Sequence, residues 1–374
     1  MAGINTEQRP VAVQRVAGSN SFNPFETLRR AANEALGGLV GGPAPAAPTA
    51  PVAAPLPAYD KKATQARLDE FRSQMRSSYT IAGEGGGPAR EVKVFPQFQM
   101  EGGMSDPESK GTPKSRLDTL SKVSAALPNL KQNPALRTAA GAAGMGRATP
   151  EQMQLVTQAL IDAGKLPPAT GDHTTDSARV RKLQWDFGLG NDCAGYVAQA
   201  ATKAAGRDLG LAGVNRNGDS LLQSLSPQHF NRVPQEAGKP IRARAGDLIR
   251  LNDPTPGEAG HWVSVYDHTT MNQEKVARLH NPNHDFWKGS SNNSEVHVYT
   301  LDSSWGAGGD WKARGSQNDV GGVDRRKWVY NAQNDRWGTY DDRSKNPTIE
   351  YSEVGPYNHL PDVKVFRPKT AEAR

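Results

Sequence analysis

The sequence lacks several features that identify common protein classes. It contains one cysteine in 374 residues, which excludes an intramolecular disulfide and a cysteine-rich zinc or iron–sulfur site. No run approaches 18 apolar residues, so we expect no transmembrane segment. The first 20 residues have no charged stretch followed by an apolar run, so no signal peptide of the Sec type is visible. We therefore expect a protein that is secreted by a non-Sec route, or that is cytoplasmic before delivery.

Apolar and aromatic residues are also scarce, and they are unevenly distributed. Hydrophobic residues make up 36% of the chain and the mean hydropathy is −0.68, both low for a globular protein. All 7 tryptophans lie at or after Trp185, and all 8 histidines lie at or after His173. The N-terminal half therefore has little with which to bury a core, and we expect the main globular domain in residues 171–374.

The net charge is mildly positive. Lysine and arginine number 45 against 39 aspartates and glutamates, which gives a formal charge of +6. This balance suits an anionic surface such as a cell wall or a membrane, or nucleic acid, and the alternative is that it serves solubility alone. Among these partners we expect a cell wall and no nucleic acid.

The N-terminal half divides into three predicted segments. Residues 1–58 are typical of a disordered tail and linker, because their second part holds six prolines among alanines and glycines. One short helix is predicted within this tail, over 24–36. Residues 59–113 are predicted to be weakly structured, with one lone strand in the VKVF stretch. Residues 114–170 are predicted to be a small helical region.

Apolar spacing predicts three further helices in these segments. The first lies within 59–79, where one stripe is formed by Leu68, Phe71 and Met75. The second lies within 115–127, where one face is formed by Leu117, Leu120, Val123 and Leu127. The third begins after an N-cap at Thr149 with a proline in its first position, and it ends at Gly164.

From about residue 171 the pattern changes to that of strands. One helix is predicted over Cys193–Ala205, with Asn191 or Asp192 as its N-cap and Gly206 as the residue that ends it. The strand-like runs are GDLIRL (246–251), HWVSVYDH (261–268), EKVARLH (274–280), EVHVYTLD (295–302), RRKWVYN (325–331) and DVKVF (362–366). This order predicts an α+β fold in which the helix packs against an antiparallel sheet.

The only cysteine lies in the first turn of the predicted helix. Unsatisfied backbone N–H groups and the helix dipole favour a thiolate at that position, and the thiolate is the nucleophilic form. The alternative is that Cys193 is a small buried apolar residue, as free cysteines often are.

A thiolate nucleophile needs a base and a group that orients the base. His261 opens a predicted strand and can point toward the helix start, although it could also be a surface histidine. The orienting group is then Asp302, at the end of the next strand, or else His280, at the end of the 274–280 run. Asp302 could instead cap the following turn, and His280 could merely be exposed.

Together these residues resemble the NlpC/P60 and CHAP-type cysteine amidohydrolases and peptidases of the papain-like superfamily. That family has a cysteine in an Asp-Cys-Ser/Ala-Gly-Phe/Tyr-Val motif that opens a helix, followed by a Gly-Asp-Leu-Ile/Val strand and a His-Val-Gly-Ile-Tyr-like strand. The similar segments here are 192–197, 246–249 and 261–266. Ser264 replaces the glycine of the third motif, and the similarity covers about residues 180–305.

The resemblance implies a papain-like domain with Cys193 as the nucleophile and His261 as the base. The family's third residue is polar and lies on the next strand, which corresponds here to Asp302 or His280. The thiolate would attack a carbonyl carbon, with a backbone N–H at the helix start in the oxyanion hole. The histidine would protonate the leaving amine, and water would resolve the thioester.

Other polar and aromatic residues give weaker indications. Gln184 and Trp185 precede Cys193 by nine and eight residues, so either could line the cleft or supply a second oxyanion donor, while Trp185 is also a candidate core residue. The histidines lack the spacing of metal ligands, and we expect no metal and no cofactor.

Three functions remain open. The first is a peptidoglycan amidase or endopeptidase. The second is a secreted or injected effector or toxin that uses the same Cys–His chemistry on a host or rival-cell protein, with its N-terminal region read by a secretion chaperone or apparatus. The third is a non-catalytic binding module in which residues 114–168 are the functional part.

Overall fold

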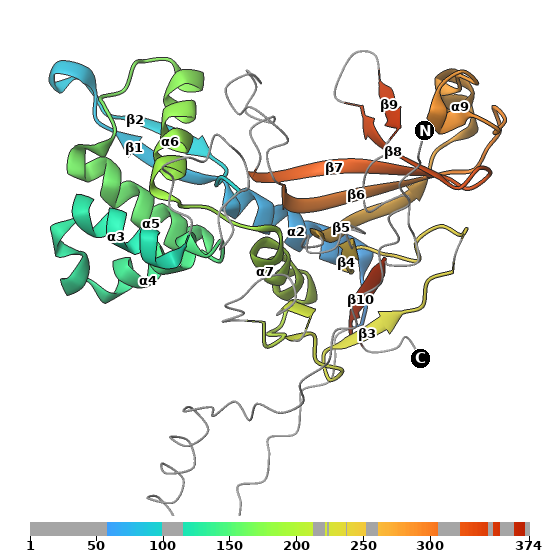
Figure 1. Cartoon of the computed structure of the whole chain (residues 1–374), viewed down its shortest axis with the longest axis horizontal. Helices are drawn as coiled ribbons and strands as arrows, with labels where there is room; N and C mark the ends of the chain where they lie inside the picture. Colours follow the sequence, from blue (N-terminus) through green and yellow to red (C-terminus); the bar gives the residue numbers. More distant parts are fainter. Residues whose placement is uncertain are drawn as a thin grey trace, which may run out of the picture. The chain divides into compact units, whose positions relative to one another are not determined.

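The computed structural model describes residues 58–98, 115–211, 221–222, 224–236, 238–251, 261–305, 322–342, 347–351 and 363–370. Within them the chain is a mixed α+β protein with antiparallel sheets, as the sequence predicts (Figure 1). The predicted tail of 1–58, with its helix over 24–36, lies outside the described residues except for residue 58. None of the described helices is long and apolar enough to cross a membrane.

One part of the structure is mainly helical. Its helices are α3 (Arg116–Ala126), η3 (Pro128–Gln132), α4 (Pro134–Gly144), α5 (Pro150–Leu160), η4 (Ile161–Lys165) and α6 (His173–Phe187). The α5 helix begins as the sequence predicts, with Thr149 in a capping box with Gln152. The turn after it contains Gly164 at φ +70°, a conformation that favours glycine. Their apolar side chains form one core with the hairpin of β1 (Ser77–Ile81) and β2 (Arg90–Val94).

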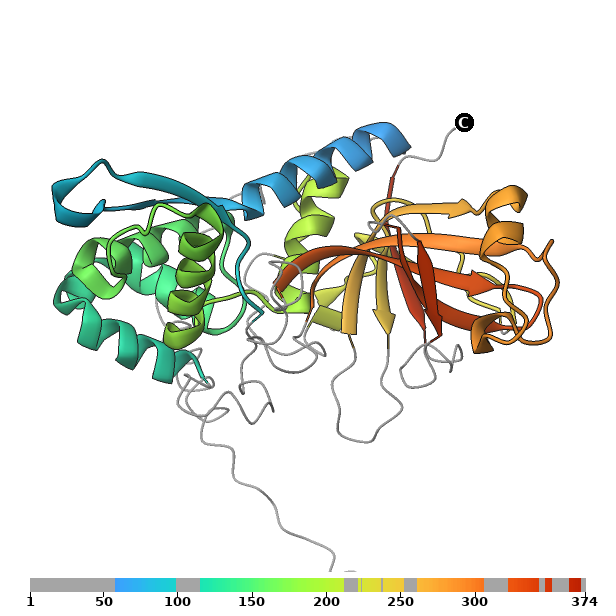
Figure 2. The ribbon, with the colours of Figure 1, turned by 90° about the horizontal axis from the view of Figure 1, so that it is seen from above.

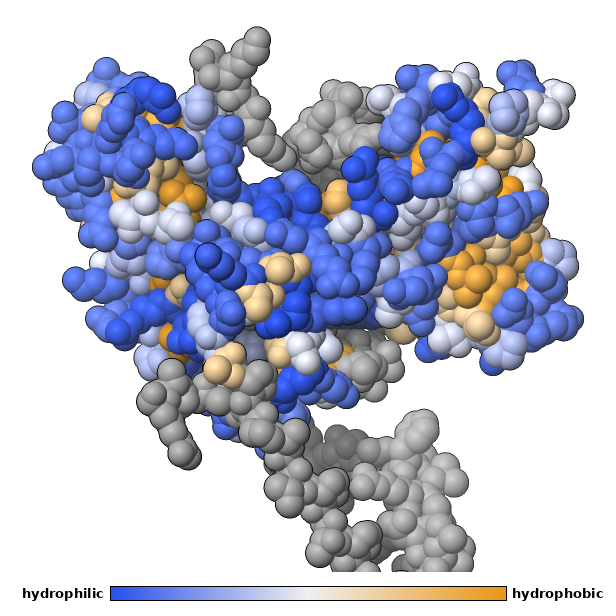
Figure 3. Space-filling model, turned by 180° about the vertical axis from the view of Figure 1, so that it is seen from behind, coloured by the Kyte–Doolittle hydropathy of each residue, from blue (hydrophilic) through white to orange (hydrophobic). Residues whose placement is uncertain are grey.

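The apolar face of α3 differs from the predicted one. Leu117 is 75% exposed, whereas Thr119 and Val123 are buried. The reason is the close approach of α4, where Gly144 leaves room for Thr119 and a Cβ at that glycine would lie 2.7 Å from the threonine. This packing turns α3 so that Leu117 faces outward. The face drawn in Figure 3 is mainly hydrophilic and carries a few hydrophobic patches.

Residues 59–113 are predicted to be weakly structured, but their described part, 59–98, is well packed. It forms α2 (Lys61–Met75), η1 (Glu84–Gly86) and the antiparallel hairpin of β1 (Ser77–Ile81) and β2 (Arg90–Val94). The predicted stripe of Leu68, Phe71 and Met75 is buried, as expected of a helix. The VKVF strand is not alone, because the end of the predicted helical stretch turns into its partner strand, β1. The remaining residues of the segment, 99–113, lie outside the described part.

The larger sheet has eight strands in the order β3-β10-β4-β5-β6-β7-β8-β9, with every neighbouring pair antiparallel. The strands are β3 (Phe230–Val233), β4 (Leu248–Leu251), β5 (His261–Thr270), β6 (Val296–Trp305), β7 (Gly322–Asn331), β8 (Arg336–Asp341), β9 (Thr348–Tyr351) and β10 (Lys364–Pro368). Helix α7 (Cys193–Ala205) packs on this sheet beside α2 (Figure 2). The predicted arrangement of a helix on an antiparallel sheet is therefore present.

One predicted strand is a helix. Residues 274–280 lie mostly in α9 (Gln273–Leu279), whose N-cap Asn272 accepts a hydrogen bond from the backbone N–H of Lys275. The run buries only Val276, so it lacks the alternation that a half-buried strand requires. The short turn η5 (Asp285–Trp287) follows it.

The two faces of the sheet bury different cores. The face that carries Leu248, Trp262 and Phe366 packs with α7 and α2, and we call it the α7 face. The opposite face, which we call the far face, carries a second core that includes Leu251, Val263, Leu301, Trp305 and Trp328. Because side chains alternate along a strand, the face of each residue follows from its register.

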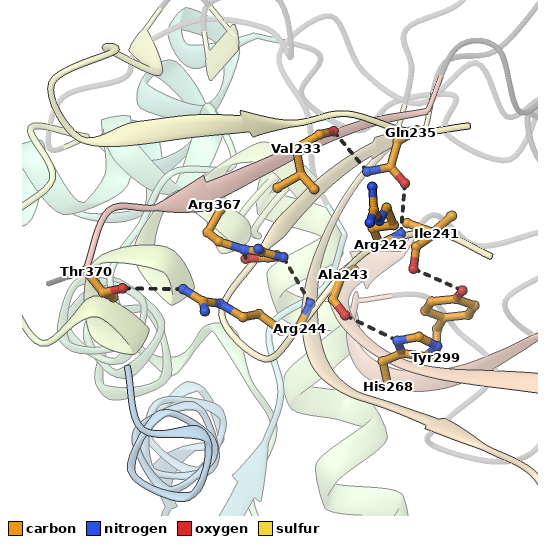
Figure 4. Close-up of polar contacts among 11 residues, drawn as sticks. Val233, Gln235, Ile241, Arg242, Ala243, Arg244, His268, Tyr299, Arg367 and Thr370 are labelled. Carbon is orange, nitrogen blue, oxygen red and sulfur yellow. Dashed lines mark hydrogen bonds and ion pairs between the residues drawn. The ribbon is translucent and has the colours of Figure 1, made fainter. Parts of the chain in front are cut away.

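Hydrogen bonds fix the connection from β3 to β4 on the sheet (Figure 4). The carbonyls of Ile241 and Ala243 face Tyr299 Oη at 3.2 Å and His268 Nδ1 at 3.3 Å, so β6 and β5 hold this segment. Asp247, in the Gly-Asp-Leu-Ile motif, accepts from Arg367 Nη2 at 2.8 Å and from the backbone N–H of Arg244 at 3.0 Å. The aspartate of this motif therefore ties the start of β4 to β10.

Candidate active site

Cys193 is the first residue of α7, where the sequence places it. Asp192 is the N-cap, and its Oδ1 accepts from the backbone N–H of Gly195 at 2.5 Å and from Arg147 Nη1 at 2.7 Å. The helix start is pressed against the preceding helical part, because a Cβ on Gly195 would lie 2.1 Å from the carbonyl oxygen of Gly146. Glycine is required here for space rather than for backbone conformation.

The surroundings of the thiol favour its neutral form. Burial raises the pKa of Cys193 to about 12, the charge of Asp192 adds to this rise, and the Trp262 backbone N–H and Arg147 oppose it. The sequence predicts a thiolate stabilised by the helix start, but in this geometry desolvation outweighs that stabilisation. The thiol itself is half-buried and packs at the edge of the α7-face core.

His261 is the first residue of β5, and its ring lies on the far face. In the sheet it pairs with Leu251 of β4, a far-face residue. Its ring stacks at a tilt on Trp305, with ring centroids 4.5 Å apart. Burial, with Arg326 nearby, lowers the pKa of His261 to about 3, and its Nε2 bonds to no group in the described part of the chain.

The backbones of Cys193 and His261 therefore lie near each other in the fold, but the two side chains are directed to opposite faces of the sheet. Two backbone N–H groups interact with the Cys193 sulfur, one from Ala194 and one from Trp262, the residue directly after the histidine. The side chain of Trp262 lies on the α7 face, so its neighbour in the strand points the other way.

The spacing of the third motif explains this outcome. The family motif His-Val-Gly-Ile-Tyr separates its histidine from its tyrosine by four residues, whereas His261 and Tyr266 are five apart. With a period of two, one extra residue moves the histidine to the other side of the sheet. Counting the residues of the motif would have shown this difference in the sequence.

Asp302 lies on the α7 face and is not a neighbour of His261. It pairs with Ser264 across β5 and β6, and its side chain is 1% exposed. Both carboxylate oxygens accept from Arg325, Oδ1 from Nε at 2.7 Å and Oδ2 from Nη2 at 2.8 Å. Burial raises the pKa of Asp302 and the hydrogen bonds from Arg325 oppose the rise. In this geometry the carboxylate is half of a buried ion pair rather than the group that orients the histidine.

Arg325 extends this ion pair to α2. Its Nη1 lies 2.9 Å from Asp69 Oδ1, and its guanidinium lies over the ring of Tyr266, 3.4 Å from the centroid. The hydroxyl of Tyr266 in turn donates to Asp69 Oδ2 at 2.9 Å. The cluster joins α2, β5, β6 and β7, and it is a feature that sequence reasoning missed. No local sequence pattern identifies Arg325, because its role depends on its pairing with Asp302 between β6 and β7.

The alternative third residue, His280, also lies elsewhere. It is the C-cap of α9 and not the end of a strand, so the expectation that it follows a strand is wrong. Its Nε2 lies 3.1 Å from the carbonyl oxygen of Ser290, and its ring contacts the edge of Trp287.

The two weaker candidates belong to α6 (Figure 1). Gln184 is fully buried in the helical part, and its Nε2 donates to Tyr79 Oη at 3.1 Å and to Thr157 Oγ1 at 3.4 Å. Gln184 is thus committed to interactions away from Cys193. Trp185 is half-buried in the last turn of the same helix.

The described residues contain no group of three or more His, Cys, Asp or Glu side chains that could hold a metal ion. The strongest histidine cluster is a pair, with His268 Nε2 at 3.1 Å from His297 Nδ1. Glu295 lies 3.1 Å from the other ring nitrogen of His297. Burial lowers the pKa of both histidines.

Comparisons of the chain with protein-family models, with curated proteins and with solved structures each found no match.

Proposed function

We propose that the chain is a cysteine-dependent amide hydrolase of papain-like type, with Cys193 as its nucleophile and His261 as its base. The observation that carries this proposal is the placement of the Cys193 sulfur, at the capped start of α7, against the backbone N–H of the residue that follows His261. The order of elements supports it, since α7 and the edge strand β3 are followed by β4, β5 and β6, which are antiparallel neighbours in the sheet.

The described geometry then corresponds to a resting state. Both groups are neutral near pH 7, because the pKa of the thiol is about 12 and that of the imidazole about 3. Activity requires the start of β5 to leave its pairing with Leu251, so that the ring of His261 leaves its stack on Trp305 and reaches the α7 face. The histidine is the first residue of its strand, so this change involves one end of β5 rather than the whole sheet. Contact with the thiol would then favour the ion pair.

The proposed reaction has two steps. The Cys193 thiolate attacks the carbonyl carbon of an amide, and the protonated His261 gives its proton to the leaving amine, so that a thioester remains on the sulfur. Water then adds to the thioester with the histidine as base, which releases the carboxylic acid and restores the thiol. In this proposal the backbone N–H of Cys193 donates to the developing oxyanion. The positive net charge favours the peptides of an anionic cell wall as substrates.

Purified protein incubated with peptidoglycan tests this proposal. We expect new free amines with the native chain and none with Cys193→Ala. The matched control is Ser290→Ala, a half-buried position near His280 and away from α7. It should release amines at the native rate. If no free amines are released from peptidoglycan, muropeptides or a general peptide library, the proposal is refuted.

A second function is favoured by one observation, the opposite orientation of Cys193 and His261. A non-catalytic binding module would keep both groups neutral and half-buried, as they are here. In that case Cys193→Ala leaves every phenotype unchanged.

If the chain instead acts on a protein inside a target cell, its expression in the cytoplasm is toxic and the toxicity is lost with Cys193→Ala.

A further inference from the structure

A cavity of about 530 Å³ lies on the side of α7 that faces the helical part. Its walls come from α2, the start of α3, α4, the start of α5, and α7. It follows α7 from Gly195 to Lys203, a length of about 12 Å at 1.5 Å per residue. Cavities of this size hold small ligands, and Cys193 is not part of the lining.

The lining combines apolar side chains with one buried arginine, which is ion-paired with Asp192. Phe71, Met145 and Ala198 are buried apolar members of the wall. Of the charged residues in the lining, Arg116, Glu151, Lys203 and Asp208 are exposed, whereas the side chain of Arg147 is 9% exposed. A ligand in this cavity therefore meets apolar surface and one buried guanidinium, whose Nη1 pairs with Asp192 at 2.7 Å.

The lining also offers groups that bind a peptide backbone. Gln199 uses its Nε2 to donate to the carbonyls of Ala148 and Gly195, both at 3.2 Å. Its Oε1 accepts no hydrogen bond from the described residues and can accept one from a peptide N–H. This carboxamide lies on α7 one turn after Gly195, on the same wall as Ala198.

We infer that this cavity binds a short peptide with an apolar C-terminal residue, whose carboxylate pairs with Arg147. The guanidinium fork suits a carboxylate better than a neutral amide. The apolar wall takes the last side chain, and Gln199 holds the backbone. The site does not require Cys193 to be a nucleophile.

Binding at this site also affects the candidate nucleophile. Arg147 bonds to Asp192, the N-cap of α7, and its charge lowers the pKa of Cys193 while that of Asp192 raises it. A carboxylate that shares Arg147 adds negative charge and weakens its effect on the thiol. The bound peptide therefore raises the pKa of Cys193 and disfavours the thiolate, and this gives the cavity the role of an inhibitory site, a role that rests on the proposed function.

Calorimetry on the full chain tests the site with two probes, N-acetyl-alanyl-leucine and the same compound with its C-terminal carboxylate replaced by an amide. We expect the acid to bind and the amide to bind at least about ten-fold more weakly. Ala142→Leu fills part of the cavity from α4 and should weaken binding of the acid by about ten-fold or more. The matched control is Ala163→Leu, at an exposed position of the turn after α5, which should bind as the native chain does.

The reactivity of the thiol tests the link to Cys193. At saturation with the acid probe, we expect labelling by iodoacetamide to slow by about three-fold, which corresponds to a pKa rise of about half a unit. Equal binding of acid and amide, no binding of either, or native binding by Ala142→Leu overturns the site. Unchanged labelling at saturation overturns the link. A failure to release amines from peptidoglycan concerns the proposed function and leaves these binding results intact.

Discussion

Replacing Asp302 by asparagine separates a structural role of this carboxylate from a catalytic one. The side chain is 1% exposed, and both of its oxygens accept hydrogen bonds from Arg325 at 2.7 and 2.8 Å. Removing the charge of Asp302 weakens two charge-assisted hydrogen bonds of Arg325, which keeps Asp69 as a partner at 2.9 Å, and this costs about 2–3 kcal/mol. We expect Asp302→Asn to lower the free energy of unfolding by this amount and the melting temperature by about 4 °C or more.

The measurement is urea unfolding of the native chain and of two variants. The matched control is Asp267→Asn, an aspartate of β5 whose ion pair with Lys61 is short, at 2.6 Å, but has side chains 48% and 25% exposed. It should cost less than about 1 kcal/mol. If Asp302→Asn is as stable as the native chain but loses amine release, the carboxylate is catalytic and our reading of the ion pair is refuted.

Three further predictions follow from the same packing. The folded state disfavours protonated His261, whose pKa is about 3, so stability relative to His261→Asn should be full above about pH 6.5 and fall as the pH drops toward 3. Parallel lines of unfolding free energy against pH would contradict this. Gly195→Ala should destabilise the chain by about 1–3 kcal/mol, because the new Cβ meets the Gly146 carbonyl at 2.1 Å. In contrast, Gly141→Ala, in α4 against the end of a flexible arginine, should be neutral or gain up to about 1 kcal/mol in thermal unfolding. Iodoacetamide should label Cys193 slowly until well above pH 9, since burial raises its pKa to about 12, and a midpoint below about pH 8 would show that the thiol is not buried as described.

Local signals in the sequence predicted the helix ends well. Thr149 and Gly164 mark the start and end of α5 and its following turn, and Cys193–Ala205 is helical between Asp192 and Gly206. Caps and helix-ending glycines act through the backbone of their own segment, so neighbouring residues suffice to identify them.

Features that depend on packing between segments were predicted less well. Leu117 is exposed because α4 approaches α3 closely at Gly144, which no pattern within α3 reveals. The 274–280 run contains branched apolar residues, but the side chain of Asn272 caps it as a helix. Tertiary contacts and capping override weak periodicity in such short runs.

The candidate site shows the same limit. The sequence placed Cys193 correctly at a helix start, but the face to which His261 points depends on one residue of spacing in β5. The partner of Asp302 depends on the register between β6 and β7, which sets Arg325 opposite it. The sequence identified a histidine and a carboxylate at suitable strand ends, but it could not show whether the two side chains are in contact.

The covalent intermediate tests the central claim most directly. The full chain is incubated with muropeptides, and the reaction is quenched in acid. The protein is then digested, and the mass of the fragment that contains Cys193 is measured by mass spectrometry. We expect an acyl group to accumulate on Cys193 before the release of amines reaches its steady rate, and we expect no adduct in the Cys193→Ala variant. Amine release with no acyl group on Cys193, or release that survives in Cys193→Ala, would contradict it.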